Sequence, residues 1–223
     1  MNQLLLKTNV FMNKVNLGDN CKVTIPWAIC GGFALDLFLE KDIRKHSDID
    51  ICVFEKDREK IFQYMLQNNW NVYEFCGQGK VRLLDAASTS EIGRNLMCIR
   101  GKCELVNFYP SDEKNFLYHE FIHTGIKEFN YLEFLFNILD EDYLVFDKSR
   151  GIKRELAKAI LFKSGIPFLA PEIVLLYKSS RSDNIEYDYD FEQTYLYMDD
   201  EQKKWFSQNL NVLYPNGHRW KMR

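Results

Sequence analysis

The 223-residue sequence lacks the features of an exported, membrane-bound or nucleic-acid-binding protein. No apolar run is long enough to span a bilayer, and the N-terminus carries no cleavable signal. None of the six cysteines forms a Cys-x-x-Cys pair, so we expect free thiols in a reducing cytoplasm and no disulfides. The formal net charge is −3 and the basic residues form no stripe, which argues against a nucleic-acid partner.

The composition that remains is ordinary for a soluble globular protein. Hydrophobic residues make up 46% of the chain and charged residues 27%. The length allows one large domain or two small ones. The sequence has no internal repeat and no low-complexity linker. We expect a mixed αβ domain over residues 1–150 and a helical domain over residues 151–223.

Two aspartates, Asp48 and Asp50, stand one residue apart on a predicted strand. Because alternate residues of a strand share a face, these carboxylates project together, while Ile49, Ile51 and Val53 point into a core. Two carboxylates on one face repel each other unless a cation lies between them. Mg²⁺ prefers carboxylate and phosphate oxygens. We therefore expect both aspartates to be metal ligands.

A glycine pair, Gly31-Gly32, precedes this strand and opens a short helix predicted over 33–40. Such glycines allow backbone amides to approach an anion closely. Asp-x-Asp alone is a common strand ending, and Gly-Gly alone is usually a turn. Their ordered combination is more specific, because a metal pair beside a phosphate cradle is the outline of a nucleotidyl-transfer site.

This segment resembles the DNA polymerase β-type nucleotidyltransferase superfamily and, within it, the lincosamide and aminoglycoside 2''-nucleotidyltransferases. The pattern of that group runs Gly-Gly-Trp-Ala-[LI]-Asp and then Arg-x-His-x-Asp-[IL]-Asp-[IL]. Phe33 replaces the usual Trp. The positions in register here are Gly31, Gly32, Ala34, Leu35, Asp36, Arg44, His46, Asp48 and Asp50.

A second match lies nearer the C-terminus. Residues 165–178, Gly-Ile-Pro-Phe-Leu-Ala-Pro-Glu-Ile-Val-Leu-Leu-Tyr-Lys, are similar to the group's Gly-Ile-Pro-Tyr-Leu-x-Pro-Glu-x-x-Leu-Leu-Tyr-Lys. Asp190-Phe191 and Gly217-His218-x-Trp220 resemble its last two landmarks. The landmarks keep their order over nearly the whole chain, with a weaker middle from about residue 71 to 127.

The resemblance implies an α+β fold, with a nucleotidyltransferase-type mixed β-sheet, flanking helices and a small helical C-terminal part. It implies a Mg²⁺-dependent adenylyltransferase that moves AMP from ATP, or another nucleoside monophosphate, to a hydroxyl of a small molecule. An aminoglycoside or lincosamide antibiotic is the expected kind of acceptor. Asp48 and Asp50 would hold Mg²⁺, and the Gly31 and Gly32 amides would bind the triphosphate.

A third carboxylate usually completes such sites in this superfamily, as a metal ligand or a general base. Glu133 is the first choice, because it is the lone acid in an apolar strand and lies on the face opposite Phe134 and Phe136. Glu104, between Cys103 and Leu105, is the alternative. Either residue could instead be a rim carboxylate exposed to water.

Two basic residues are candidates for phosphate contacts. Arg44 could pair with phosphate oxygens, or it could form a salt bridge to Asp36 or Asp48. Lys178 matches the lysine of the group and could reach nucleotide or pyrophosphate. A lysine at a helix end is also favoured by the helix dipole alone.

Clustered acids and aromatics over 186–190 would suit a cationic acceptor, since carboxylates and ring faces attract ammonium groups. The same cluster could be a solvated helix start. The alternative functions are nucleotidylation of a protein or an RNA, and a non-catalytic nucleotide-binding regulatory module. The sequence leaves the acceptor and the oligomeric state open.

Periodicity elsewhere predicts further elements. An opening helix is expected over 2–15, and Asp57 is expected to cap a helix that runs through Asn68. Arg100-Gly101-Lys102 is a predicted hairpin turn. Residues 110–127 fit a helix or a loop. Strands are expected at 23–29, 71–75, 80–84, 95–100, 103–109 and 143–146, and C-terminal helices from Pro171, over 190–198 and over 199–210.

Overall fold

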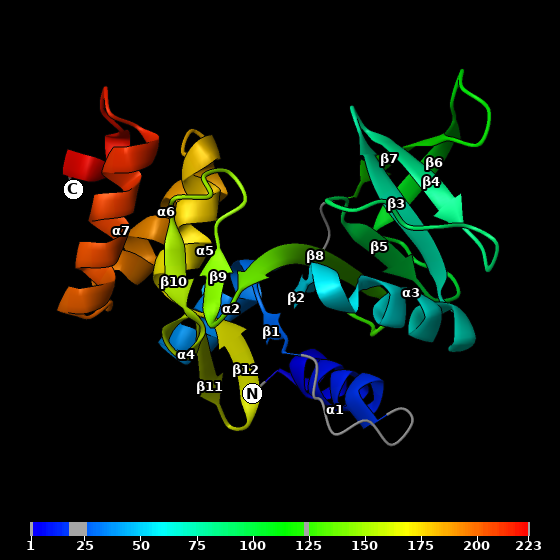
Figure 1. Cartoon of the computed structure of the whole chain (residues 1–223), viewed down its shortest axis with the longest axis horizontal. Coiled ribbons are helices and arrows are strands. Elements are labelled where there is room, and N and C mark those ends of the chain that lie inside the picture. The colour runs from blue at the N-terminus through cyan, green and yellow to red at the C-terminus, as the bar shows by residue number, and fades with distance from the viewer. Residues whose placement is uncertain (1, 18–25, 123–124, 223) are drawn as a thin grey trace. The chain divides into compact units, whose positions relative to one another are not determined.

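The computed structural model describes residues 2–17, 26–122 and 125–222 (Figure 1). They fold into two compact units. The first contains residues up to 28 together with 45–138, and the second contains 29–44 together with 139–223. The expected boundary at residue 150 stays a prediction. In the structure the C-terminal segment of the second unit begins at residue 139, and the same unit also includes the segment with the glycine pair.

The first unit is a mixture of helices and strands, as the predicted α+β class requires. Its helical segments include α1 (Gln3–Leu17), the short 3-10 helix η1 (Glu55–Asp57) and α3 (Arg58–Gln67). Its strands include β2 (Asp50–Phe54), β3 (Asn71–Gly77), β4 (Lys80–Leu84), β5 (Leu96–Ile99), β6 (Val106–Pro110), β7 (Leu117–Phe121) and β8 (Tyr131–Asp140).

One mixed sheet organises this unit. Its strands follow the order β2-β8-β5-β3-β4-β7-β6. β2 and β8 run parallel, whereas the other neighbouring pairs are antiparallel. In the parallel pair Asp50 lies opposite Glu133. The register of two strands far apart in sequence therefore determines which acidic residues meet.

Alternation along β8 separates a buried face from the face that carries Glu133. Leu132 and Phe134 are completely buried. The guanidinium of Arg58, at the start of α3, lies 3.7 Å from the ring centre of Phe136. Because α3 also contacts β3, this helix covers the apolar face of the sheet (Figure 1). The acidic residue is left on the opposite face.

Most of the expected elements of this unit are confirmed, with one wrong strand pairing. β5 pairs with β3 and β8, whereas β6 pairs with β7, so Arg100-Gly101-Lys102 does not close a hairpin. β7 lies in the stretch 110–127 that fitted a helix or a loop. A turn-forming glycine marks a bend, but it does not specify which strands meet after the bend.

The start of α3 and the strand expected at 23–29 differ from the prediction. Asp57 precedes α3, but its side chain makes no capping hydrogen bond, so the expected cap is wrong. The 3-10 turn η1 places it in a conformation outside the extended region that capping residues adopt. The strand expected at 23–29 falls partly on residues 18–25, which lie outside the described part of the chain; Ala28–Ile29 form β1.

The second unit begins with the end of β1 and α2 (Gly31–Leu39). Ile29 of β1 lies parallel to Phe168 of β12, which in turn pairs antiparallel with β11. Its further elements are β9 (Tyr143–Val145), β10 (Lys153–Glu155), α4 (Leu156–Ala159), β11 (Ile160–Lys163), β12 (Ile166–Leu169), α5 (Pro171–Lys178), η2 (Ser179–Arg181), α6 (Ile185–Tyr195), α7 (Asp200–Leu213) and η3 (Arg219–Met222).

Helices α5, α6 and α7 form the helical C-terminal part, and α5 contacts both of the others (Figure 1). The last two sequence landmarks meet here: the ring of Phe191 stacks on that of Trp220, with 4.5 Å between centroids and 4° between planes. The indole nitrogen of Trp220 donates to Asp188 at 2.8 Å. α6 begins earlier than expected because Asn184 caps its first turn.

No helix among the residues that the structure describes has the length and apolar character needed to cross a membrane.

Arg154 of β10 connects the starts of two helices through a buried ion pair with Glu172 and an ion pair with the exposed Glu201. Its Nη2 donates to Glu172 of α5 at 2.6 Å, and its Nη1 donates to Glu201 of α7 at 2.7 Å. Arg154 and Glu172 are almost completely buried. Burial is the largest influence on the Glu172 carboxyl and raises its pKa, so the carboxylate depends on this arginine for compensation.

Replacing Arg154 with methionine should therefore lower the free energy of unfolding by about 3–5 kcal/mol, because it leaves the Glu172 carboxylate buried without its cation. Urea denaturation followed by circular dichroism measures this loss. The double variant Arg154→Met/Glu172→Gln should recover part of it, since the uncompensated charge is gone. A loss below about 1 kcal/mol, as for an exposed pair, would contradict a buried ion pair here.

Candidate active site

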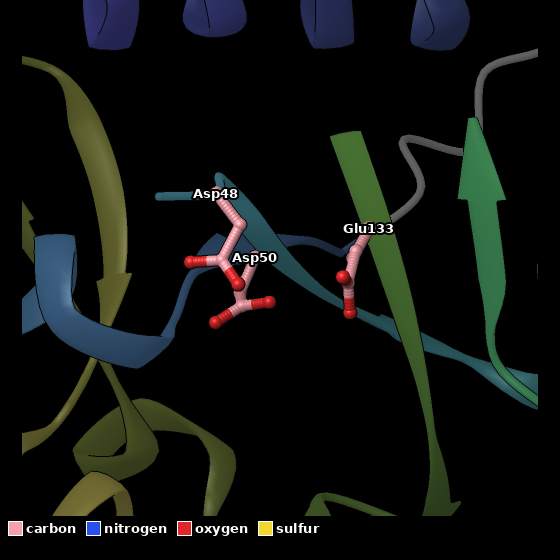
Figure 2. A group of neighbouring side chains, drawn as sticks. All are labelled: Asp48, Asp50 and Glu133. Atoms are coloured by element: carbon pink, nitrogen blue, oxygen red, sulfur yellow. The ribbon is translucent and has the colours of Figure 1, made fainter. Parts of the chain in front are cut away.

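Three carboxylates lie together on β2 and β8 of the first unit (Figure 2). Asp50 is the first residue of β2, Asp48 precedes it by two positions, and Glu133 is the third residue of β8. One oxygen atom from each side chain lies within 4.8 Å of the other two. All three side chains are partly exposed, so a ligand can reach them.

The local sequence explains this arrangement. Ile49, Ile51 and Val53 are fully buried, and this fixes the intervening carboxylates on the opposite face. The backbone N–H of Glu133 donates to the carbonyl of Ile49 at 2.9 Å. The parallel register then places Asp50 directly beside Glu133.

The electrostatic environment of Glu133 is unusual. Burial and the neighbouring Asp48 carboxylate raise the pKa of Glu133 to about 8. The hydroxyl of Tyr131 donates a short hydrogen bond to Glu133, which opposes this rise. Burial and the adjacent Glu133 charge also raise the pKa of Tyr131, so its hydroxyl keeps its proton and donates the hydrogen bond to Glu133. Ionisation of Glu133 beside Asp48 therefore costs free energy unless a cation compensates the negative charges.

A divalent cation fits this group of ligands. Among the described residues, these three side chains form the acidic group whose ligand atoms come close enough to hold one ion together. All of the ligand atoms are carboxylate oxygens, which hard cations such as Mg²⁺ prefer over zinc-type nitrogen and sulfur sets. A bound cation would stabilise the ionised form of Glu133 and so lower its raised pKa.

Glu104 does not join the group. Its side chain is 82% exposed, and its nearest ion-pair partner is Lys102 at 3.7 Å. The geometry thus favours Glu133 over Glu104 as the third carboxylate, while the catalytic role of Glu133 stays a prediction.

The glycine pair begins α2 in the second unit. Gly31 has a φ of 63°, in the left-handed region that glycine adopts without strain. Cys30 precedes it and makes no side-chain capping bond. The first N–H groups of a helix lack intrahelical partners, and the helix dipole favours an anion there. Phosphate binding by Gly31 and Gly32 stays a prediction that this geometry permits.

Arg44 and Lys178 meet at one buried carboxylate, that of Asp190. Arg44 donates from Nε to Oδ1 at 2.8 Å and from Nη2 to Oδ2 at 3.0 Å. The Lys178 ammonium lies 2.9 Å from Oδ2. Burial opposes the charge on Asp190, but the two cations outweigh it and hold the pKa of this carboxyl below its usual range.

These contacts show which ion pairs the two basic residues form. Arg44 was expected to bind Asp36 or Asp48 if it did not bind phosphate; its carboxylate contacts include Asp190 and Glu186. Asp36 accepts a hydrogen bond from the backbone N–H of Ile43. Long-range pairing between positions 44 and 190 leaves no trace in the local sequence.

The acidic residues of the cluster over 186–190 form ion pairs with cations of the protein. Glu186 pairs with Arg44 at 3.2 Å, and Asp188 pairs with Arg219 at 2.7 Å. Asp190 is completely buried. The expectation that these acids attract the ammonium groups of an acceptor stays a prediction: Asp190 is already compensated by Arg44 and Lys178, whereas the Glu186 side chain is 62% exposed.

Sequence reasoning missed two residues that contact candidate side chains within their own units. Tyr131 shares the strand face of Glu133 two residues away, and this spacing was the available signal. Asp190 was noted as a landmark and as a member of the acidic cluster over 186–190, but nothing in the sequence shows that it would pair with both Arg44 and Lys178.

The structure brings two aspartates and a glutamate together on adjacent segments of a mixed sheet, the arrangement that the sequence resemblance led us to expect. Residues 17–118, which include the glycine pair and both aspartates, match the family model of aminoglycoside-2''-adenylyltransferase. This match confirms the resemblance predicted from the sequence, and with it an enzyme of the nucleotidyltransferase class. A search of curated protein sequences gave no match.

Two solved structures share the fold. One is the solution structure of the antibiotic-resistance factor ANT(2'')-Ia, which is 12% identical, with 94% of each chain covered and a TM-score of 0.50. The other is the lincosamide antibiotic adenylyltransferase LnuA with lincomycin bound, which is 13% identical, with 89% of this chain and 98% of that chain covered and a TM-score of 0.51. At these identities the likeness establishes the fold and not the substrate.

The raised pKa of Glu133 predicts a pH-dependent stability in the absence of divalent cations. Between about pH 4.5 and 8 the folded state keeps a proton that the unfolded chain has released, so the free energy of unfolding should fall as pH rises through this interval. Urea denaturation in EDTA across the interval measures the slope.

The matched variant for that measurement is Glu133→Gln, which cannot titrate at this position. Its stability should fall less steeply with pH than that of the wild type. Equal slopes for the two proteins would show that the pKa of Glu133 is not raised in the folded state.

Proposed function

We propose that the protein transfers AMP from ATP, in a Mg²⁺-dependent reaction, to a hydroxyl group of a small molecule such as an aminoglycoside or lincosamide antibiotic. The observation that carries this proposal is the proximity of Asp48, Asp50 and Glu133, whose oxygens lie within 4.8 Å of one another. The family match over 17–118 supports the adenylyl donor and the antibiotic acceptor.

The three carboxylates have two proposed roles, metal binding and proton acceptance. Asp48 and Asp50 would hold Mg²⁺, which when bound supplies charge neutralisation on the phosphate oxygens. Glu133 would accept the proton of the acceptor hydroxyl. The hydroxyl oxygen then forms the new bond to the α-phosphorus, and the bond to the leaving pyrophosphate breaks. The hydrogen bond from Tyr131 orients the Glu133 carboxylate and keeps one of its oxygens engaged.

Four further residues have proposed contacts with phosphate oxygens. Gly31 and Gly32 would present backbone N–H groups at the start of α2. Arg44 and Lys178 would bind triphosphate oxygens with charged donors whose positions are already set by Asp190. In such a reaction the protein contributes positioning and charge neutralisation more than covalent chemistry.

The reaction is tested by pyrophosphate release from ATP and Mg²⁺ across a panel of hydroxyl acceptors, with mass spectrometry to detect AMP adducts. We expect release to depend on one or more antibiotic-like acceptors and to stop in EDTA. Expression in a susceptible bacterium should raise the inhibitory concentration of the same compounds. Pyrophosphate release without protection or an antibiotic adduct would support nucleotidyl transfer and overturn the antibiotic acceptor.

Asp48→Asn and Asp50→Asn should each lower kcat/KM by at least about 10²-fold, because metal-borne charge stabilisation contributes several kcal/mol. Steady-state kinetics measures the loss, and circular dichroism shows that the fold is retained. Glu104→Gln is the matched control: it neutralises an exposed carboxylate of the same unit and should keep near wild-type activity. Aspartate variants that turn over like the control would overturn the metal-ligand assignment.

A further inference from the structure

The sheet face that carries Glu133 continues away from the carboxylates as a row of apolar and aromatic side chains. Directly opposite residues of neighbouring strands share a face of the sheet. The row formed in this way across β2, β8, β5, β3 and β4 consists of Asp50, Glu133, Met97, Tyr73 and Leu83. Neighbouring strands lie about 4.8 Å apart, so the backbone of Tyr73 is about 10 Å from that of Glu133. A molecule whose hydroxyl lies at Glu133 would therefore extend along this row.

The hairpin of β6 and β7 curls over the same face. It follows β4 at the end of the sheet that is far from β2 (Figure 1). Three strands separate β7 from β8 in the sheet, yet the ring centre of Phe121 lies 6.2 Å from that of Tyr131. The Phe108 ring of β6 stacks on that of Tyr73 in β3, with 4.6 Å between centroids and 19° between planes. The sheet is therefore curved, and these rings lie on its concave side.

Five rings on this concave side form a group that we call the aromatic patch. Neighbours within the patch have ring centres 4.6 to 5.4 Å apart. All five side chains are partly exposed, so they pack against one another and still present surface to a ligand. The members are Tyr73, Phe75, Phe108, His119 and Phe121. Aromatic side chains with few polar groups among them are the usual lining of a small-molecule site.

The aromatic patch carries no charge. Burial lowers the pKa of His119, so its ring is neutral at neutral pH. Glu74 and Glu120 alternate with patch residues along β3 and β7 and therefore lie on the other face. Along strands β2 to β8, all of them within the described part of the chain, Asp50 and Glu133 are the acids of this face. A molecule with several ammonium groups would find no further counter-charge here, and burial of an unpaired cation is costly.

Tyr73 adds one polar atom to the patch. Burial raises the pKa of its hydroxyl, and neither a charge nor a hydrogen bond contributes to the rise. Within the part of the chain that the structure describes, this hydroxyl has no hydrogen-bond partner. Stacking on Phe108 fixes the ring, so the hydroxyl offers a hydrogen bond to a bound molecule at a defined position.

We propose that the aromatic patch is the acceptor subsite of this enzyme, where it binds the apolar face of an acceptor with at most one ammonium group and the Tyr73 hydroxyl adds a hydrogen bond. The inference rests on the proposed function, because the reacting hydroxyl of that acceptor would lie at Glu133. The row of side chains supports this occupant: it begins at the carboxylates and ends at Leu83, an apolar residue that is 52% exposed. The patch thereby selects against polycationic acceptors.

Lincomycin and tobramycin are the two probes, because they differ in charge. Lincomycin carries one basic amine and an apolar alkyl-substituted ring, whereas tobramycin is an aminoglycoside with several amines. Calorimetric titration of the full chain with each compound, without nucleotide, measures binding apart from catalysis. We expect the wild type to bind lincomycin more tightly than tobramycin, because the patch offers apolar surface and no counter-charge.

Two tyrosine-to-phenylalanine substitutions separate the patch from the rest of the sheet. Tyr73→Phe keeps the stacked ring and removes only the hydroxyl, so lincomycin should bind about two- to tenfold more weakly, the range for one net hydrogen bond. Tyr109→Phe is the matched control. Tyr109 lies on the opposite face of β6 from Phe108 and bonds to Glu120, so its substitution should leave the affinity unchanged.

A second pair of variants tests the selection against polycations. Leu83→Glu places a carboxylate beside Tyr73 at an exposed position, so the fold should be retained. It should raise the ratio of the tobramycin affinity to the lincomycin affinity about two- to fivefold, the range for an exposed ion pair. Ile92→Glu is the matched control, because it adds the same charge at an 86% exposed position in the loop that Ser90 fastens to Glu74 on the other face. Circular dichroism checks that each variant is folded.

Any of four outcomes would overturn the inference. These are no lincomycin binding by the wild type, tobramycin binding at least as tight as that of lincomycin, Tyr73→Phe with the affinity of Tyr109→Phe, and Leu83→Glu with the affinity ratio of Ile92→Glu. The expected affinities in a protein that forms no AMP adduct would support the subsite and overturn the proposed function. AMP transfer by a protein whose patch variants bind like their controls would do the reverse.

Discussion

The parallel pairing of β2 with β8 is the interaction on which the candidate active site depends. The two strands are separated by about 80 residues of chain, and their register alone brings Asp50 beside Glu133. The apolar residues between the acids anchor that register, since Ile49 and Ile51 are fully buried on the other face. Core packing and site geometry are thus two consequences of one strand pairing.

Both units concentrate charge, but they compensate it in different ways. In the first unit burial and the neighbouring Asp48 carboxylate raise the pKa of Glu133, and a hydrogen bond from Tyr131 opposes the rise. In the second unit Asp190 is enclosed by two cations, which keep its pKa low. Carboxylate oxygens that lie close to one another suit a metal ion, whereas a carboxylate buried against two cations serves as their counter-ion.

The sequence predicted much of this arrangement because strand alternation is a local property. Asp48, Asp50 and Glu133 could each be assigned to the polar face of an apolar strand, and the structure brings these three together. Strand pairing is not local, so β6 was assigned the wrong partner and β7 was missed. The pairing of Arg44 with Asp190 spans 146 positions, and no pattern in either segment indicates it.

The alternation of β2 also limits how this site can vary. Substitution of a core residue of this strand by another apolar residue leaves the acids where they are. Deletion or insertion of a single residue within β2 exchanges its two faces, so that an isoleucine replaces an aspartate beside Glu133 and a carboxylate enters the core. Among related chains, the length of this strand should therefore vary far less than its composition.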